Sequence, residues 1–193
     1  MSILAGSTAP SAPQEPCQCL QTVVFLIDEL ESVQDIAAAQ LDAGLASHRE
    51  ALRCGEAMML CGHCTSRPEN MTILTFLTDR LAGLCERIVG GYFELLRGPS
   101  TAAATPNSRR LNPAAGSSGV FFGDYEVDSA SEWELLVRNL IVLQLRALSV
   151  LMGRVKEVSG LMQCDMPWRK AAGTEKRIAM LLDRLNSMAS WDV

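Results

Sequence analysis

The sequence has few aromatic residues and no excess of positive charge. Aromatic side chains make up 5% of the 193 residues, whereas the hydrophobic share is 48%. The core material is therefore mostly Leu, Ala, Met and Val, which favours helices over a β-sandwich. The formal net charge is −5. An acidic chain does not attract a phosphate backbone by its overall field, so direct binding to nucleic acid is disfavoured.

Signals for export and for membrane insertion are also lacking. Residues 1–16 contain Pro10, Pro13 and Pro16 among small residues and no Lys or Arg, which predicts a disordered tail and not a signal peptide. No uncharged apolar stretch approaches the roughly 18 residues of a membrane span. We therefore expect an intracellular protein without a membrane partner. In that reducing compartment, seven cysteines, an odd number, do not indicate a disulfide framework.

Apolar spacing predicts an all-α fold, a helical bundle of four to five helices with a long flexible loop. The helices are expected at about 17–37, 39–61, 70–96, 129–159 and 174–189. The segment 98–119 holds three Pro and three Gly with one large apolar residue, which predicts a surface loop within one domain spanning 17–193. Residues 62–70 are expected to form another loop.

The fourth expected helix has two apolar stripes. Trp133, Leu136, Leu140 and Leu143 form one, and a second begins at Ile141. A helix that is apolar on two sides is normally central in a bundle.

A short run before that helix has a different character. Residues 120–127 (VFFGDYEV) are expected to be extended, and Ser129 with Glu132 has the spacing of a capping box. Exposed aromatic side chains commonly mark protein interfaces, so Phe121, Phe122 and Tyr125 are candidate interaction residues.

Four of the cysteines form a candidate metal site. The loop between the first two helices is short, so those helices are expected to form an antiparallel hairpin. The start of one and the end of the other then meet, which brings Cys17 and Cys19 towards Cys61 and Cys64. Four thiolates can hold a tetrahedral zinc ion. The alternative, that these are metal-free thiols packed as small hydrophobic residues, is the one we favour from sequence alone. An oxidised pair is a third, minor alternative.

The tetrapeptide Cys61-Gly62-His63-Cys64 also occurs in the active sites of protein disulfide isomerases. There it follows a strand and opens a helix. Here it follows an expected helix, whose negative end raises the pKa of a thiol, and no βαβ pattern surrounds it. We therefore do not expect redox catalysis.

The remaining reactive side chains predict no catalytic site. Cys54, Cys85 and Cys164 have no partner in the sequence and are expected to fill the core. His48 lies on the inner stripe of the second helix and is expected to be a hydrogen-bonded core histidine. We therefore expect no enzyme activity.

Three stretches taken in order resemble a known family. They are Cys17-Gln-Cys19-Leu20; the run from His48 to Cys64 followed by a Leu/Ile-rich helix; and Phe122-Gly-Asp-Tyr125-Glu-Val-Asp128 followed by Leu-Ile-Val-Leu-Gln-Leu. This order is similar to the C-terminal regulatory domain of aflatoxin regulatory proteins, fungal transcription factors that switch on secondary-metabolite gene clusters. The likeness covers residues 17–160. The six-cysteine zinc cluster and basic segment that normally precede this domain have no counterpart in the sequence.

The resemblance implies a transcriptional regulator-type domain that acts by protein–protein interaction in a fungal metabolite cluster. Its expected partner is a transcription factor or co-regulator, with no direct DNA binding by this chain and no small-molecule substrate. The expected location is the nucleus, or alternatively the cytoplasm. No cofactor is expected unless the four thiols bind zinc. The alternatives are a small thiol- or metal-centred enzyme and a plain helical scaffold domain.

Overall fold

The computed structural model describes residues 17–32, 41–97, 120–122, 125–127 and 129–189. The elements in these ranges are α1 (Cys19–Ser32), α2 (Leu41–Leu60), α3 (Gly62–Thr65), α4 (Pro68–Arg97), β1 (Val120–Phe122), β2 (Tyr125–Val127), α5 (Ala130–Leu161) and α6 (Asp165–Ala189). The predicted all-α fold is confirmed. The tail expected at 1–16 and the loop expected at 98–119 lie outside the described residues.

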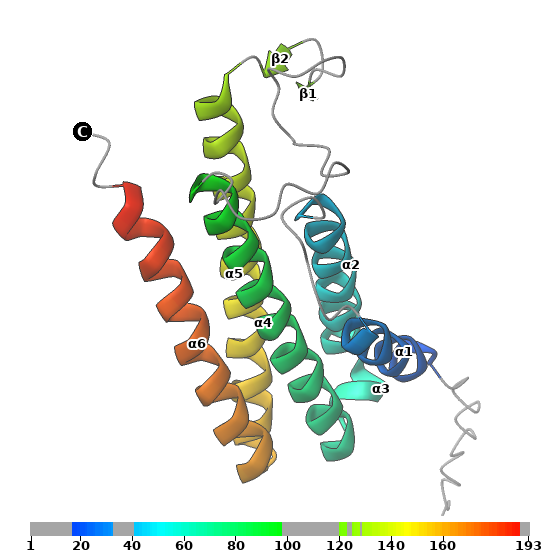
Figure 1. Ribbon diagram of the computed structural model, residues 1–193. Helices are drawn as coiled ribbons and strands as arrows, with labels where there is room; N and C mark the ends of the chain where they lie inside the picture. The colour runs from blue at the N-terminus through cyan, green and yellow to red at the C-terminus, as the bar shows by residue number, and fades with distance from the viewer. Residues whose placement is uncertain (1–16, 33–40, 98–119, 123–124, 128, 190–193) are drawn as a thin grey trace, which may run out of the picture.

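The four long helices form an up-and-down bundle. In Figure 1, α2 and α5 run down the page, α4 and α6 run up it, and α1 lies across the lower end. Helix α4 packs against every other described helix. Its buried side chains include Leu77, Leu81, Leu84, Ile88 and Tyr92, the stripe that helical spacing predicts.

Helix α5 differs in part from its prediction. The stripe that begins at Ile141 is buried, as expected, but Leu140 and Leu143 of the other stripe are 42% and 60% exposed. The helix contacts α2, α4 and α6, yet α4 has the more completely covered surface. The central position predicted for α5 therefore belongs more to α4, because only one apolar side of α5 meets other helices.

By length and composition alone, α5 is the one helix in the described part of the chain that is apolar enough to cross a membrane. A core helix of a bundle has the same composition, and α5 packs on three neighbours. This observation is therefore weak evidence for a membrane span.

Two predicted boundaries were wrong. Residues 62–65 form the short helix α3, and α4 begins at Pro68, where a proline is tolerated because the first helical N–H has no partner within the helix. Helix α6 begins at Asp165, nine residues before the expected start at 174. Pro167 lies in its first turn and is buried, so packing fixes a start that periodicity does not indicate.

A tight corner joins α5 to α6. Only Met162, Gln163 and Cys164 separate the two helices. Gln163 has a φ of 58°, in the left-handed region that ends many helices. The Cys164 N–H donates to the Ser159 carbonyl at 2.8 Å, so the last turn of α5 is closed by hydrogen bonds.

The face between α4 and α6 is held by charged groups. The Arg177 guanidinium lies 2.8 Å from Asp79 and 2.8 Å from Glu86, and the Lys170 ammonium lies 3.2 Å from Asp79. The hydrogen bond to Glu86 is the largest cause of a raised pKa for Arg177. On the same helix, Ile178 and Leu185 are buried. We refer to Asp79, Glu86, Lys170 and Arg177 as the ion-pair face.

Residues 120–122 and 125–127 are extended, as predicted for the run 120–127, while residues 123 and 124 lie outside the described part of the chain. Strands β1 and β2 pair antiparallel with each other, Val120 opposite Val127. Among the described residues no other segment joins this pair of strands, so the all-α class is unchanged. The predicted cap of α5 is also confirmed, because the Ser129 hydroxyl accepts a hydrogen bond from the Glu132 N–H at 3.1 Å.

Candidate metal centre

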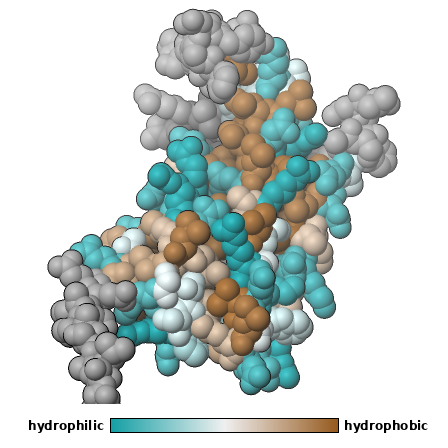
Figure 2. Space-filling view, turned by 180° about the vertical axis from the view of Figure 1, so that it is seen from behind, coloured by the Kyte–Doolittle hydropathy of each residue, from teal (hydrophilic) through white to brown (hydrophobic). Residues whose placement is uncertain are grey.

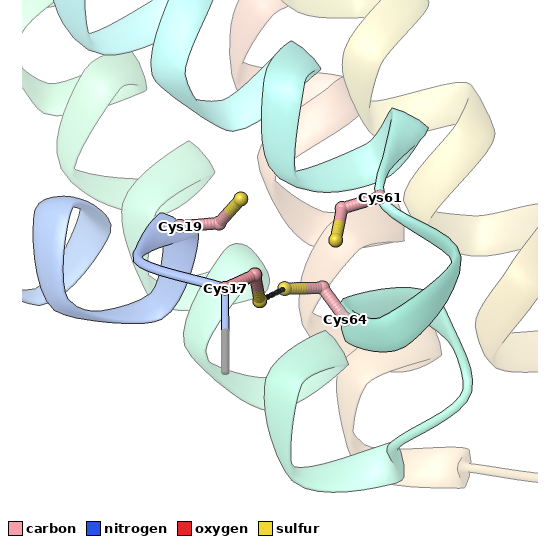
Figure 3. A group of neighbouring side chains, drawn as sticks. All are labelled: Cys17, Cys19, Cys61 and Cys64. Carbon is pink, nitrogen blue, oxygen red and sulfur yellow. Dashed lines mark hydrogen bonds between the residues drawn. The ribbon is translucent and has the colours of Figure 1, made fainter. Parts of the chain in front are cut away.

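Four cysteines from two distant parts of the chain meet at the lower end of the bundle. Cys17 and Cys19 stand at the start of α1, Cys61 lies between α2 and α3, and Cys64 is in α3. Their Sγ atoms all lie within 4.8 Å of one another, and Figure 3 shows the four side chains converging on one point. The predicted clustering of these four residues, here called the thiol cluster, is confirmed.

The geometry that produces the cluster differs from the predicted one. Helix α1 lies across the lower end of α2 and not alongside it (Figure 1), so the expected antiparallel hairpin is wrong. The start of α1 still meets the end of α2 because α1 packs against both α2 and α4. Buried Val23 and Leu30 supply the apolar contact that holds α1 there.

The turn that carries Cys61 and Cys64 is fixed by its backbone. The Cys61 carbonyl accepts hydrogen bonds from the N–H groups of Cys64 and Thr65, both at 3.0 Å. The buried Asn70 amide donates to the Cys64 carbonyl at 3.1 Å. Sequence reasoning missed this role of Asn70, and the only signal was an amide side chain in the first turn of a helix, where it can reach back to the preceding backbone.

The distances between the four sulfur atoms are compatible with a bound metal ion. Zn–S bonds of about 2.3 Å place neighbouring thiolates near 4 Å apart. The Sγ atoms of Cys17 and Cys64 are 3.2 Å apart, and every other pair lies within the 4.8 Å limit. Cys64 is buried, while the other three side chains are half-buried. The cluster thus has one buried cysteine and three that solvent can partly reach.

The thiols of the cluster differ in acidity. A hydrogen bond from the Cys64 backbone N–H is the main cause that lowers the pKa of Cys61 to about 7. Burial raises the pKa values of Cys64 and Cys19. The raised pKa predicted for Cys61 is therefore wrong. Cys61 does follow α2, but it also precedes α3, whose first N–H groups favour a negative charge.

The three remaining cysteines and His63 lie in or near the core. Cys85 is buried, and Cys54 and Cys164 are half-buried, so core filling describes Cys85 fully and the other two in part. His63 is half-buried beside the cluster, but the group with metal-binding geometry consists of the four thiols.

His48 is fully buried on the inner face of α2, as predicted. Burial lowers its pKa to about 4, and the neighbouring Gln144 side chain opposes this effect. Neither ring nitrogen has a hydrogen-bond partner of ordinary geometry among the described residues, so the predicted hydrogen bond is not found there. The neutral imidazole is therefore packed as a core group.

The candidate interaction residues fall on two elements. Phe121, Phe122 and Tyr125 lie in the β1–β2 hairpin, but their side chains are outside what the structure describes. Exposed aliphatic side chains also follow one side of α5, a set we call the α5 row: Leu135, Leu140, Leu143 and Val150. Figure 2, seen from the side on which α5 lies, shows hydrophobic side chains gathered along the middle and upper part of this face.

Comparison with protein families, with curated proteins and with solved structures gave no match to this chain. The features of the chain that bear on its function are therefore the thiol cluster and the exposed surface.

Proposed function

We propose that this chain is a helical protein-interaction domain in transcriptional control, fixed at its lower end by a structural zinc ion. The observation that carries the proposal is the convergence of four cysteine Sγ atoms within 4.8 Å of one another. Soft thiolate ligands in a tetrahedral set select zinc among the common divalent ions. The ion would join the start of α1 to α3, elements that otherwise share little apolar contact.

The ligand set supports a structural site more than a catalytic one. Catalytic zinc keeps one position open for water or substrate, whereas four cysteines occupy all positions of a tetrahedron. The described neighbours of the cluster include no carboxylate within metal-binding distance. This argues against a metal-centred enzyme, the main alternative.

Metal analysis tests the zinc. Protein prepared with zinc and without chelator is expected to hold close to one zinc ion per chain, and the Cys61→Ser variant is expected to lose most of it. Cys54→Ser is the matched control, since Cys54 is a half-buried thiol outside the cluster and its removal should leave the zinc content unchanged. A wild-type protein that is metal-free and fully folded would refute the proposal.

The interaction role is supported by the α5 row and by the resemblance to aflatoxin regulatory proteins. Leu143 and Val150 are 60% and 58% exposed, and exposed aliphatic rows of this kind mark docking surfaces. From the resemblance, the partner is a full-length zinc-cluster transcription factor of a fungal metabolite cluster, and the place of action is the nucleus. This chain would change the activity of that factor without reading DNA itself.

Binding between purified proteins tests this role. The chain is expected to bind a full-length zinc-cluster activator of the aflatoxin type, and Leu143→Glu is expected to weaken the affinity at least tenfold. Met180→Glu on α6 changes an equally exposed apolar residue (63%) and serves as the control. Equal loss of affinity in both variants, or no binding by the wild type, would count against the α5 row as the docking surface.

The acidic charge predicts the behaviour towards DNA. With a net charge of −5, the isolated chain is expected to show at most weak, salt-sensitive binding. A mobility-shift assay at physiological salt is the measurement. Sub-micromolar, sequence-specific binding would contradict the proposal that the partner reads DNA and this chain does not.

A further inference from the structure

The thiol cluster combines three properties that a purely structural site does not need. Three of its four side chains are half-buried, so small solutes can reach them. Two of its sulfur atoms, from Cys17 and Cys64, already lie 3.2 Å apart, and Figure 3 shows them pointing at each other. These two residues are separated by 47 positions in the chain, so a bond between them would connect α1 to α3.

A disulfide is within reach of these two residues. An S–S bond of about 2.05 Å requires the sulfur atoms of Cys17 and Cys64 to approach by roughly 1 Å. Cys17 precedes the first residue of α1, and its side chain can move without disturbing the helix. The cluster can therefore be closed in two ways, by a metal ion or by a covalent bond.

Resting on the zinc site of the preceding section, we propose that the thiol cluster is a peroxide-responsive switch in which oxidation of Cys17 and Cys64 to a disulfide expels the zinc ion. The oxidant is a hydroperoxide. One thiolate attacks the peroxide oxygen and becomes a sulfenic acid as the O–O bond breaks. The second thiolate attacks that sulfur, the S–S bond forms and hydroxide leaves.

The step balances with hydrogen peroxide as the oxidant. The two thiolates lose two electrons in total, and the peroxide takes up these electrons and two protons from solvent to leave two water molecules. The zinc ion keeps its charge throughout. It loses two of its four ligands, and the remaining pair, Cys19 and Cys61, binds it too weakly to retain it.

The switch has two closed states and one open state. Zinc closes the reduced cluster and the disulfide closes the oxidised one, while the reduced, metal-free cluster leaves the start of α1 held only by its apolar contacts. Because α1 packs on α2 and α4, the chemical state of the cluster is transmitted to the bundle through α1. Oxidation therefore replaces the zinc link between α1 and α3 by a covalent one without unfolding the domain.

The test uses the full chain as a Cys54→Ser/Cys164→Ser variant, which removes the half-buried thiols outside the cluster and leaves buried Cys85 in place. Metal content before oxidation tests the zinc proposal by itself. Stoichiometric hydrogen peroxide is then expected to release the zinc, with loss of two thiols for each ion and a Cys17–Cys64 link in peptide mapping. A reducing agent with added zinc should restore the starting state.

The outcomes separate the two proposals. Zinc that is bound but stays in place under a tenfold excess of peroxide would refute the switch and leave the structural zinc intact. Release that ends in sulfinic acid, or in a link that omits both Cys17 and Cys64, would also refute it. In the Cys17→Ser variant the mapped disulfide must vanish; if release still proceeds at the wild-type rate, Cys17 has no part in the switch.

Discussion

The thiol cluster and the ion-pair face hold neighbouring helices together by different means. At the thiol cluster, α1 and α3 meet through four sulfur atoms within 4.8 Å of one another. At the ion-pair face, α4 and α6 meet through Arg177, Lys170 and two carboxylates over a layer of buried aliphatic side chains. In the proposal made above, the first contact depends on an ion or an oxidant from the solution. The second is complete within the chain.

This difference shows where regulation can enter such a fold. A contact built from aliphatic burial and partly exposed ion pairs responds gradually to salt and temperature. A contact built from thiols has discrete states, because zinc is bound or absent and a disulfide is formed or broken. In the proposed switch, the bundle formed by α2, α4, α5 and α6 is the stable part, and the α1–α3 end is the responsive part.

Metal removal is expected to have the largest effect and to be confined to one region. At free zinc about 1,000 times its dissociation constant, a bound ion contributes about 4 kcal/mol to the free energy of unfolding. Chelation should remove that contribution and abolish amide-exchange protection in α1 and α3. Amides of α5 and α6 should keep their protection. Uniform loss along the chain would show that the two regions are not separable.

Acid is expected to lower the free energy of unfolding through His48, a buried residue of α2. Burial lowers its folded-state pKa from 6.5 to about 4, so between these values the unfolded chain binds more protons than the folded one. Stability therefore falls as the pH drops from 6.5 to 4, by about 3 kcal/mol in all.

Comparison with a His48→Leu variant isolates this contribution. Urea unfolding of both proteins at several pH values, at equal zinc, should give a shallower pH dependence for the variant by that amount. Parallel curves for the two proteins would mean that His48 is not the group responsible.

Loss of Arg177 is expected to have the smallest effect. The side chain is 34% exposed, and partly exposed ion pairs contribute about 1 kcal/mol or less. Arg177→Met keeps most of the apolar stem, so urea unfolding at low salt should show a loss of about that size. At about 1 M salt the loss should shrink, because the charges are screened.

Arg53 provides the matched control for Arg177. It pairs with Glu50 at 3.6 Å, and both side chains are far more exposed, at 73% and 61%. Arg53→Met is expected to change stability by a few tenths of a kcal/mol at most. An effect larger than that of Arg177→Met would remove the distinction between the ion-pair face and ordinary surface pairs.

The parts of the fold that follow from helical spacing were predictable. Long stripes such as the one through Leu77, Leu81 and Leu84 placed α4 within two residues at its start. Helix α3 has only four residues, less than the span over which a period can be recognised. The start of α6 was missed because the large apolar side chains of its first turn, Met166 and Trp168, are exposed and do not belong to the buried stripe, whereas Pro167 between them is buried.

Which residues form the site was easier to predict than how the helices that carry them are arranged. Short connections confined Cys17, Cys19, Cys61 and Cys64 to one end of the bundle, so their meeting followed from the sequence. The crossing of α1 over that end did not, because crossing angles depend on how side chains of two surfaces interlock. The acidity of Cys61 depends on α3, and an error about that short helix became an error about the thiol.

The tight corner at Gln163 bears on the order in which the chain folds. Helices that meet across three residues close a short loop, whereas the thiol cluster must bring Cys17 to a residue 47 positions away. Contacts between near neighbours in sequence form faster than distant ones, because less chain entropy is lost. The α5–α6 pair is therefore expected to assemble before the thiol cluster. The cluster should in turn form before the contacts between α4 and α6, such as Arg177 to Glu86, which span 91 positions, so that a folding chain can capture metal before its bundle is complete.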